Sequence, residues 1–416
     1  MERFDVVIVG GGVAAGAVAG VLREEVESPL SIAVVCAEPH PPYTRPGLTK
    51  QILRGERPEA KALHRSAEWY AENDVTLLTG EAVVDIDRLG HSVRLAGRSI
   101  GYSTLVLATG SEPRRIPAPP EIADRVHVIR SFADAAAVRE ALGSGIRWGV
   151  VGGGFVGAEF AASARMMGDD VLMVLPEDMV MERALGAVAG AWVTDGLVRH
   201  GVDVRTGSGV AGLDVDHGSP VIVLTDGSRE VVDRVVVGIG TTPAIGLAAQ
   251  SGLELADGGV ATDAFFRTSD PDVFAVGDIA AWTSPLHGDR RVRVEHVDTA
   301  RAQGEHVGRV IGGLDVGPFR ELPYFFSGLG DWAFIEHVSI GQGAGVRRGV
   351  PDDTTMSVAQ LDESGALVAM TVVGVPDDLD AARDLLSRGT PVPLDAELLS
   401  RPEVPLADAA LSAPPR

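Results

Sequence analysis

One pattern occurs twice in this chain and restricts its fold more than any other feature: a buried strand, a glycine-rich turn and a helix. The first copy is predicted from a strand at 4–9, a turn at 10–12, a helix to about residue 25 and a strand at 31–36. The second has a strand at 147–151, a turn at 152–154, a helix to about 167 and a strand at 171–174. Continuous apolar strands that alternate with helices indicate a parallel sheet covered on both faces. The sequence therefore predicts an α/β fold.

Both turns have small residues at the three positions that a dinucleotide-binding turn requires. The first glycine permits a sharp turn, the second lets the backbone approach a pyrophosphate, and the third position must be small for helix and strand to pack. The helix N-terminus then offers N–H groups and a partial positive charge to the phosphates. These positions hold Gly10, Gly12 and Ala15 in the first copy and Gly152, Gly154 and Gly157 in the second. We expect two Rossmann-like domains.

The two copies differ at the residue that accepts the adenosine ribose. Glu38 follows the second strand of the first copy, where a carboxylate can accept both ribose hydroxyls. The equivalent position of the second copy is Leu175, and the nearest acids are Glu177 and Asp178. An arginine would suit a 2′-phosphate, and Arg183 is near enough in sequence to be considered. NADH is favoured over NADPH because an acid is nearer.

Charge and cysteine content exclude several classes of function. With 36 basic and 58 acidic residues the formal net charge is −22, which disfavours binding to nucleic acid or to an anionic membrane. The single cysteine, Cys36, excludes an intramolecular disulfide, a dithiol relay and a cysteine-based metal cluster, so no metal is expected. A cytoplasmic protein is consistent with this. The uncharged run at 6–22 is explained better by strand, turn and helix than by a membrane span.

The rest of the chain is more mixed. Short strands are predicted at 221–224 and 234–239, and a buried strand at 273–276 precedes Gly277 and Asp278. Towards the C-terminus we expect strands at 332–339, 355–361 and 367–375 and a helix at 378–388. The last dozen residues, from about 405, are expected to be a frayed tail.

Several segments, in their order along the chain, resemble motifs of ferredoxin reductase-like flavoproteins. This group includes putidaredoxin reductase, rubredoxin reductase and the reductases of aromatic-ring dioxygenases. Residues 42–50 read PYTRPGLTK and are similar to the family's PYxRPxLSK. Further matches are found at 108–110, 237–240 with Pro243, 268–273, 276–278 and 293–296. The resemblance implies an FAD-binding domain at 1–113 and 243–320, an NAD(P)-binding domain at 114–242 and a C-terminal α+β domain at 321–416.

The resemblance also implies which residues bind the cofactors. FAD would be held by Gly10, Gly12, Ala15, Glu38, Arg45, Lys50, Ala108, Thr109, Gly110, Gly277, Asp278, Glu295, His296 and Val297. The nicotinamide nucleotide would be held by Gly152, Gly154, Phe155, Val156, Gly157, Glu177 and Gly240. His296 is the one histidine near the expected flavin.

Lys50 and Glu159 are the candidate catalytic residues. In similar enzymes such a lysine and glutamate pair beside flavin N5 and contact the nicotinamide carboxamide. A buried lysine also stabilises the negative charge that a flavin gains on reduction. The structural alternative is a surface lysine and a glutamate favoured by the dipole at a helix start.

Three departures from the family pattern fall at one end of the expected flavin site. Relatives carry tryptophan after the Glu-His pair, where this chain has Val297. The family's PxFWSDQ-like segment reads PYFFSGL at 323–329, so Phe326, Gly328 and Leu329 replace tryptophan, aspartate and glutamine. The loss of both indoles removes stacking surface and two N–H donors. It opens room for a small substrate, marks a changed partner, or reflects drift within one activity.

The first hypothesis for function is an FAD-dependent NAD(P)H oxidoreductase that passes single electrons to a ferredoxin-like iron–sulfur protein serving an oxygenase. Such carriers are usually acidic, and the densest basic cluster here is formed by Arg290, Arg291, Arg293 and Arg301. The second is a flavoenzyme that acts directly on a small molecule or dioxygen. The third is a nucleotide-sensing binding protein that resembles apoptosis-inducing factor. The sequence indicates no oligomeric state.

Overall fold

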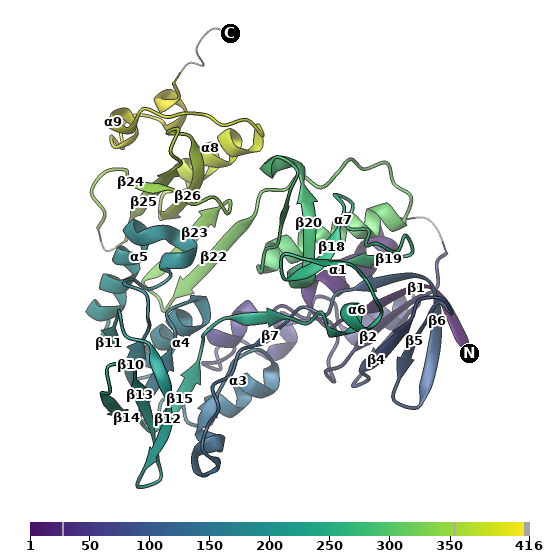
Figure 1. Cartoon of the computed structure of the whole chain (residues 1–416), viewed down its shortest axis with the longest axis horizontal. Helices are drawn as coiled ribbons and strands as arrows, with labels where there is room; N and C mark the ends of the chain where they lie inside the picture. The colour runs from purple at the N-terminus through teal and green to yellow at the C-terminus, as the bar shows by residue number, and fades with distance from the viewer. Residues whose placement is uncertain (27–28, 353, 412–416) are drawn as a thin grey trace. The chain divides into compact units, whose positions relative to one another are not determined.

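The computed structural model describes residues 1–26, 29–352 and 354–411 of the chain (Figure 1). Two compact units can be distinguished. Unit 1 consists of Met1–Arg45, Glu59–Glu112 and Thr242–Pro323, and unit 2 of Pro46–Pro58, Pro113–Thr241 and Tyr324–Arg416. The chain therefore passes repeatedly from one unit to the other. The three-domain division stays a prediction.

Unit 1 is built on a parallel sheet with the strand order β3-β2-β1-β6, and β19 pairs with the last residues of β6. The central strand is β1, whose Val6 lies opposite Ile32 on one side and Thr104 on the other. Strands β5 and β4 extend the sheet antiparallel to β6. The bounds are β1 (Glu2–Val9), β2 (Ile32–Cys36), β3 (Val75–Thr79), β4 (Val83–Asp87), β5 (Ser92–Leu95), β6 (Arg98–Leu107) and β19 (Val273–Ala275).

Helices and a small second sheet complete unit 1. Its helices are α1 (Val13–Glu24), α2 (Ala67–Glu72), α6 (Gly246–Gln250) and α7 (Val297–Ile311). Its second sheet consists of β17 (Leu255–Ala256), β18 (Gly259–Thr262), β20 (Ala280–Ser284) and β21 (Arg290–Val292). Helices α1 and α7 pack so closely that a Cβ on Gly304 would overlap the carbonyl oxygen of Ala14. This contact explains why α1 is rich in alanine and glycine.

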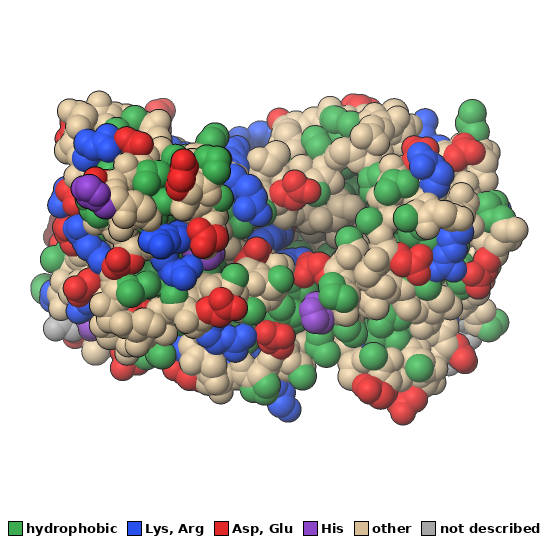
Figure 2. Space-filling view, turned by 90° about the horizontal axis from the view of Figure 1, so that it is seen from below, with side chains coloured by type: hydrophobic (Ala, Val, Ile, Leu, Met, Phe, Trp, Pro, Cys, Tyr) green, Lys and Arg blue, Asp and Glu red, His purple; other side chains and the backbone are tan. Residues whose placement is uncertain are grey.

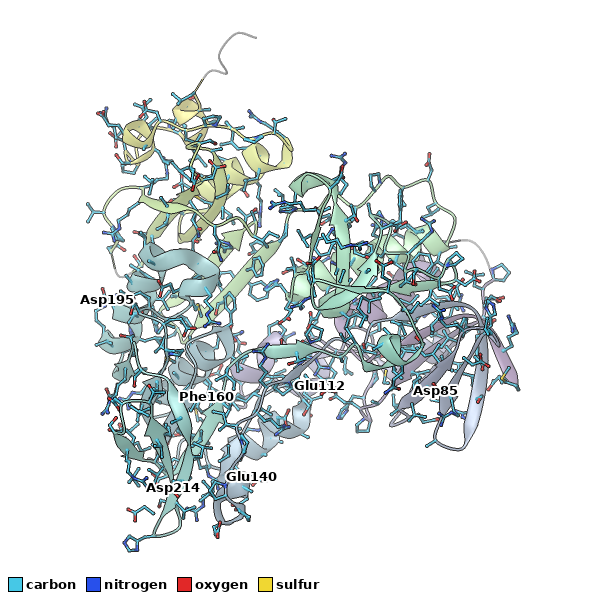
Figure 3. All side chains as sticks on the ribbon, in the orientation of Figure 1. Asp85, Glu112, Glu140, Phe160, Asp195 and Asp214 are labelled. Atoms are coloured by element: carbon cyan, nitrogen blue, oxygen red, sulfur yellow. The ribbon has the colours of Figure 1, made fainter. Side chains whose placement is uncertain are left out.

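Unit 2 repeats part of this topology, since its strands β11-β10-β9-β15 correspond in order to β3-β2-β1-β6 of unit 1. Its parallel sheet has the order β11-β10-β9-β15-β8, with β9 in the central position that β1 occupies in unit 1. Phe160, labelled in Figure 3, projects from α4 onto the buried Trp148 of β9, with ring centroids 5.1 Å apart. The bounds are β8 (Val126–His127), β9 (Arg147–Val151), β10 (Asp170–Val174), β11 (Val202–Arg205), β15 (Arg234–Val237), α3 (Phe132–Arg139), α4 (Phe155–Met166) and α5 (Glu182–Arg199). The predicted fold of two Rossmann-like domains is confirmed.

The remaining strands of unit 2 form two antiparallel sheets. One is a three-stranded meander of β12 (Val210–Asp216), β13 (Ser219–Leu224) and β14 (Arg229–Val231). The other has the order β22-β23-β26-β25-β24 and is covered by α8. Its elements are β22 (Tyr324–Leu329), β23 (Ala333–Val338), β24 (Ala344–Arg347), β25 (Met356–Leu361), β26 (Leu367–Val373), α8 (Pro376–Ser387) and α9 (Ala396–Leu399). The remaining short strands are β7 (Ser111–Pro113) and β16 (Thr241–Pro243). The C-terminal α+β elements expected from the sequence are present.

The expectation of a frayed tail from about residue 405 is wrong for its first part. Residues Leu406–Ala409 form a 3₁₀ helix, and Leu406 is 1% exposed. Arg348 holds the chain that precedes this helix, because its buried guanidinium donates to the carbonyl oxygens of Leu399 and Val404 at 2.8 and 3.0 Å. The rest of the predicted tail, 412–416, lies outside the described residues.

Within the described part of the chain, no helix combines the length and apolar character needed to cross a membrane. The uncharged run at 6–22 is divided between β1, the glycine turn and α1, as predicted.

Candidate functional site

The first glycine turn joins β1 to α1 in unit 1. Gly10 has φ +147°, and a Cβ at this position would overlap the Ala108 carbonyl oxygen. Gly12 is the N-cap of α1 and provides no side-chain cap, while a Cβ on Gly12 would meet, beyond its chain neighbours, none of the described residues within 4 Å. Ala15 is fully buried against the sheet. The helix N-terminus therefore presents uncapped N–H groups to open space, as a bound phosphate requires.

Glu38, the expected ribose acceptor, follows β2. Its carboxylate accepts a hydrogen bond of 2.6 Å from the Tyr43 hydroxyl and one of 3.0 Å from Arg45. The Arg45 guanidinium also lies over the Tyr43 ring, 4.8 Å from its centroid. These contacts hold the carboxylate in one orientation and leave its side chain 30% exposed. The structure thus places Arg45 beside Glu38, a pairing that the sequence did not predict.

A second part of unit 1 lies where β6 and β19 end side by side. Asp278 accepts a hydrogen bond of 2.6 Å from Ser111, and the Thr109 hydroxyl donates to the Ala244 carbonyl at 2.7 Å. Ala108 and Gly110 flank Thr109 in the turn after β6, and Gly110 has φ +70°. Gly277 donates its N–H to the Gln303 Oε1 at 2.7 Å.

Two buried donors near this site were missed by sequence reasoning. Among the described residues, Thr299 Oγ1 and Gln303 Nε2 on α7 have no hydrogen-bond partner, although both side chains are buried. Buried polar groups are almost always hydrogen-bonded, so these two require a partner such as a cofactor. Together with the uncapped helix they fit FAD. Both residues lie on the buried face of a helix, and no motif marks them in the sequence.

The start of α7 contains three further candidates. Glu295 pairs with Arg293, and His296 is the N-cap of the helix, where its Nδ1 accepts from the Asp298 N–H at 3.4 Å. Val297 is the first helical residue. This geometry gives His296 a structural function as a cap.

The second glycine turn joins β9 to α4 in unit 2. Gly152 has φ +104°, and a Cβ there would overlap the Gly238 carbonyl oxygen. A Cβ on Gly157 would overlap the Gly152 carbonyl oxygen. Gly154 is the N-cap of α4 without a side-chain cap, and among the described residues other than its chain neighbours only Gly238 O comes as near as 4.0 Å to its Cβ position. Both glycine turns therefore combine tight backbone contacts with one open glycine.

Phe155, Val156 and Gly240 also lie at this end of the second parallel sheet. Phe155 and Val156 form the first turn of α4 and are half-buried. The Phe155 ring is parallel to that of Phe325, with centroids 6.5 Å apart. Gly240 has φ +90° with open space at its Cβ position.

Lys50 and Glu159 form a buried ion pair in unit 2. Lys50 Nζ lies 2.7 Å from Glu159 Oε2, and the two residues are 8% and 5% exposed. Glu159 also accepts hydrogen bonds from the Thr49 and Ser327 hydroxyls, the latter at 2.8 Å. The surface alternative for Lys50 is thereby excluded. The predicted pairing of the two side chains is confirmed, whereas their function stays a prediction.

The Lys50 ammonium keeps unused donor capacity. Its Nζ approaches Glu159 closely but makes no hydrogen bond of good geometry within the described part of the chain. An ammonium group carries three donors, and a buried one is costly to leave without partners. Lys50 therefore fits a site in which a ligand supplies the missing acceptors.

The residues that depart from the family pattern are accommodated in different ways. A Cβ on Gly328 would lie 3.4 Å from Lys50 Cδ, so the glycine backbone borders the lysine stem. Leu329 is fully buried in the C-terminal sheet. Phe326 stacks on Phe334 with centroids 5.7 Å apart, and Phe334 is 52% exposed.

The basic cluster that the sequence suggested as a docking patch is already engaged within unit 1. Arg291 donates to the Thr262 and Ala281 carbonyls, and Arg290 to the His287 carbonyl. Arg293 pairs with Glu295, and Arg301 pairs with Asp298 and Glu305. Figure 2 likewise shows acidic and basic side chains interspersed on the face that it presents. A docking role for these arginines stays a prediction.

Cys36 is fully buried at the end of β2, and burial raises the pKa of its thiol to about 12. The group therefore stays protonated at pH 8, where only about one thiol in 10⁴ is ionised. We expect no labelling by a thiol-reactive disulfide reagent until the protein is unfolded. We also expect the flavin of the Cys36→Ala variant to be reduced by the nicotinamide nucleotide at the same rate as that of the unmodified protein. Rapid labelling of the native protein would contradict this.

Comparisons with known proteins agree with this geometry. The family model for pyridine nucleotide-disulphide oxidoreductases matches residues 4–304. The ferredoxin–NAD(+) reductase component of an anthranilate 1,2-dioxygenase system from Burkholderia cepacia is 36% identical, over 98% of this chain and 99% of the relative. A chloroplast monodehydroascorbate reductase from Oryza sativa is 35% identical, over 78% and 70%. Among solved structures, a chain of the covalent putidaredoxin reductase–putidaredoxin complex is similar to this protein. The two chains are 31% identical and superpose with a TM-score of 0.90, over 98% of this chain and 98% of the other.

Proposed function

Because this chain belongs to the pyridine nucleotide-disulphide oxidoreductase family, we propose that it is an FAD-dependent NADH oxidoreductase that delivers electrons to a ferredoxin-like iron–sulfur protein. The observation that carries the proposal is the pair of glycine turns, each with an uncapped helix N-terminus and one open glycine. Two such turns match the two dinucleotides that the reaction uses. The family and the relatives named above support it.

In this proposal unit 1 binds FAD. The first glycine turn holds the pyrophosphate, Glu38 accepts the ribose hydroxyls, and Asp278 holds the ribitol chain. The unpartnered donors Thr299 and Gln303 supply hydrogen bonds to the same group. The FAD domain, with its predicted bounds 1–113 and 243–320, lies within unit 1 except for residues 46–58 and 113. The 114–242 domain binds the nicotinamide nucleotide at the second glycine turn.

Lys50 and Glu159 are the residues we assign to the reaction. The bound cofactors supply the hydride chemistry, and the protein supplies orientation and charge. Lys50 contributes a positive charge where negative charge develops, and its burial strengthens that contribution. Glu159 orients the ammonium and is itself oriented by the Thr49 and Ser327 hydroxyls.

We propose NADH as the preferred donor, because Glu177 is the first acid after β10 and can accept ribose hydroxyls. The acceptor we propose is acidic and carries single electrons, like the ferredoxins that the named reductases serve.

The test is anaerobic stopped-flow mixing of the purified protein with NADH and, separately, NADPH. We expect rapid bleaching of the flavin absorbance with NADH and slower bleaching with NADPH at equal concentration. Reoxidation is then followed after addition of a ferredoxin from the same host. Bound FAD that is not bleached by either nucleotide would exclude the proposed function.

A second candidate is direct reduction of a small organic acceptor. It is favoured by the 35% identity to a monodehydroascorbate reductase and by Gly328, which adds no side chain beside Lys50. Turnover of NADH with a small radical or quinone, in the absence of iron–sulfur protein and at a rate above that with ferredoxin, would support it.

A further inference from the structure

Helix α4 contacts the segment of Lys50 at two levels. Glu159, which pairs with the Lys50 ammonium, and Ser163 are four residues apart, so they lie on one face of α4 in successive turns. The Ser163 hydroxyl donates to the main-chain carbonyl oxygen of Thr49 at 2.7 Å. This carbonyl belongs to the peptide group that joins Thr49 to Lys50. The helix therefore holds the backbone of the lysine as well as its ammonium.

The hydrogen bond between Ser163 and Thr49 lies in the interior of unit 2. Ser163 is fully buried, and Thr49 is 5% exposed. A serine inside a helix commonly faces water or bonds the carbonyl four residues earlier. Here its hydroxyl donates to a segment more than a hundred residues away in the sequence. Because water does not reach the bond, losing the hydroxyl would leave the Thr49 carbonyl buried without this donor, which is costly.

Arg54 connects the other side of the lysine to the same hydroxyl. Its Nη1 donates to Ser163 Oγ at 2.9 Å, and its backbone N–H donates to the Lys50 carbonyl oxygen at 2.9 Å. The Arg54 side chain is 5% exposed, and Glu56 accepts two further hydrogen bonds from its guanidinium at 2.7 and 2.8 Å. Hydrogen bonds in a chain polarise one another, so the guanidinium strengthens the bond from Ser163 to the Thr49 carbonyl.

These hydrogen bonds form a closed loop around the Cα of Lys50. The loop runs from the Lys50 carbonyl through Arg54 to Ser163. It continues to the Thr49 carbonyl and so returns to the peptide group that precedes Lys50. The Lys50 N–H in addition donates to the Gly47 carbonyl at 3.1 Å. The peptide groups on both sides of the Cα are thereby fixed, and with them the direction in which the lysine side chain leaves the backbone.

We propose that Ser163 and Arg54 are positioning residues for Lys50, which affect the rate of flavin reduction through the place of its ammonium. Glu159 holds the end of the side chain, whereas Ser163 and Arg54 hold its origin. A displacement of about 1 Å at a reacting centre costs about 100-fold in rate. A small rotation at the Cα is enlarged along the four methylene groups of a lysine. The inference rests on the proposed function, in which Lys50 supplies positive charge to the reaction.

The experiment is anaerobic stopped-flow reduction of the FAD-loaded protein over a series of NADH concentrations. It gives a limiting rate of flavin bleaching and an apparent Kd for NADH. For Ser163→Ala we expect a limiting rate lower by about tenfold or more and an apparent Kd within about twofold of the unmodified protein. Ser163→Thr keeps the hydroxyl and should restore the limiting rate to within about threefold. Arg54→Met should slow bleaching several-fold, because the Ser163 hydroxyl loses its donor.

A second genetic background decides whether Ser163 acts through Lys50. In Lys50→Met the ammonium is absent, so a residue that positions it has no further effect on the rate. We therefore expect Ser163→Ala to slow bleaching in the unmodified background and to leave the rate of Lys50→Met unchanged, which is a non-additive double-mutant cycle. If Ser163→Ala is not recovered as folded protein, Arg54→Met is carried through the same two backgrounds and decides the question.

Ser357→Ala is the matched control for the loss of a buried serine hydroxyl. Ser357 is 3% exposed, and its hydroxyl donates to Asp378 at the C-terminal sheet. It should lower the melting temperature as Ser163→Ala does and leave the limiting rate unchanged. If Ser163→Ala bleaches at the unmodified rate, or slows both backgrounds equally, the inference is wrong while the proposed function stands. If neither NADH nor NADPH bleaches the flavin of the unmodified protein, the proposed function fails, and the inference fails with it.

Discussion

Replacement of Glu159 by alanine is expected to lower the free energy of unfolding by about 3–5 kcal/mol, because it leaves a buried ammonium without its counter-charge. It also removes the acceptor for the Thr49 and Ser327 hydroxyls, both of which are on buried residues. Urea denaturation of the FAD-loaded protein measures the loss. We also expect flavin bleaching by NADH to slow by roughly 100-fold or more, since Lys50 is no longer held.

A double variant distinguishes an effect of this pair on the free energy of unfolding from an effect on the rate of flavin reduction. Lys50→Met combined with Glu159→Leu removes both charges, and similar replacements of buried pairs are often neutral for stability. We expect this protein to recover most of the unfolding free energy lost in Glu159→Ala. Flavin bleaching by NADH should remain slow. If the double variant bleaches at the rate of the unmodified protein, the pair is structural and our assignment of Lys50 and Glu159 is incorrect.

The second large effect concerns the open glycine of each turn. Gly12→Ala adds a methyl group that, apart from its chain neighbours, would have no atom of the described residues within 4 Å, at φ −101°, which alanine adopts readily. The fold should lose about 1 kcal/mol or less, the difference between glycine and alanine at an N-cap. The methyl group would, however, occupy the space we assign to the FAD pyrophosphate. We expect Gly12→Ala to be purified as folded protein with little bound flavin, measured by the 450 nm absorbance per chain.

Gly154→Ala is the counterpart at the second turn. Its Cβ would meet only Gly238 O, at 4.0 Å. We expect this variant to retain FAD and to bind NAD⁺ more weakly by about tenfold or more, the range that overpacking by one methyl group produces. Each variant is thus the control for the other. Loss of flavin from Gly154→Ala, or full flavin in Gly12→Ala, would reverse our assignment of the two turns.

The repeated architecture could be predicted because local signals agree over each copy. The last four residues of β1 and of β9 are buried, and each strand is followed by a glycine whose φ is positive in the structure. Such signals depend on residues close in sequence. Three of the five strands of the C-terminal sheet, β23, β25 and β26, were also predicted, because they have clear apolar patterns, whereas β22 and β24 were not.

The features that could not be predicted depend on residues far apart in sequence. Ser327 and Thr49 reach Glu159 across 168 and 110 positions, and no local pattern specifies such contacts. The cap formed by His296 was hidden because histidine is not a usual N-cap residue. Leu406 was assigned to a frayed tail because prolines surround it, whereas it is buried in a 3₁₀ helix that packs against α8 and α9. Motifs marked the ligand-facing positions but not the groups that orient them.

The alternation of the chain between the two units has a consequence for its synthesis. Unit 1 needs Thr242–Pro323 before it is complete, and a ribosome that adds about 5–20 residues per second reaches residue 323 only after roughly 15–65 s. Until then the small-residue face of α1 lacks α7, the helix against which Ala14 packs through Gly304. The nascent chain must therefore carry exposed apolar surface for most of its translation. Production in a heterologous host should accordingly benefit from slow induction and from abundant chaperones.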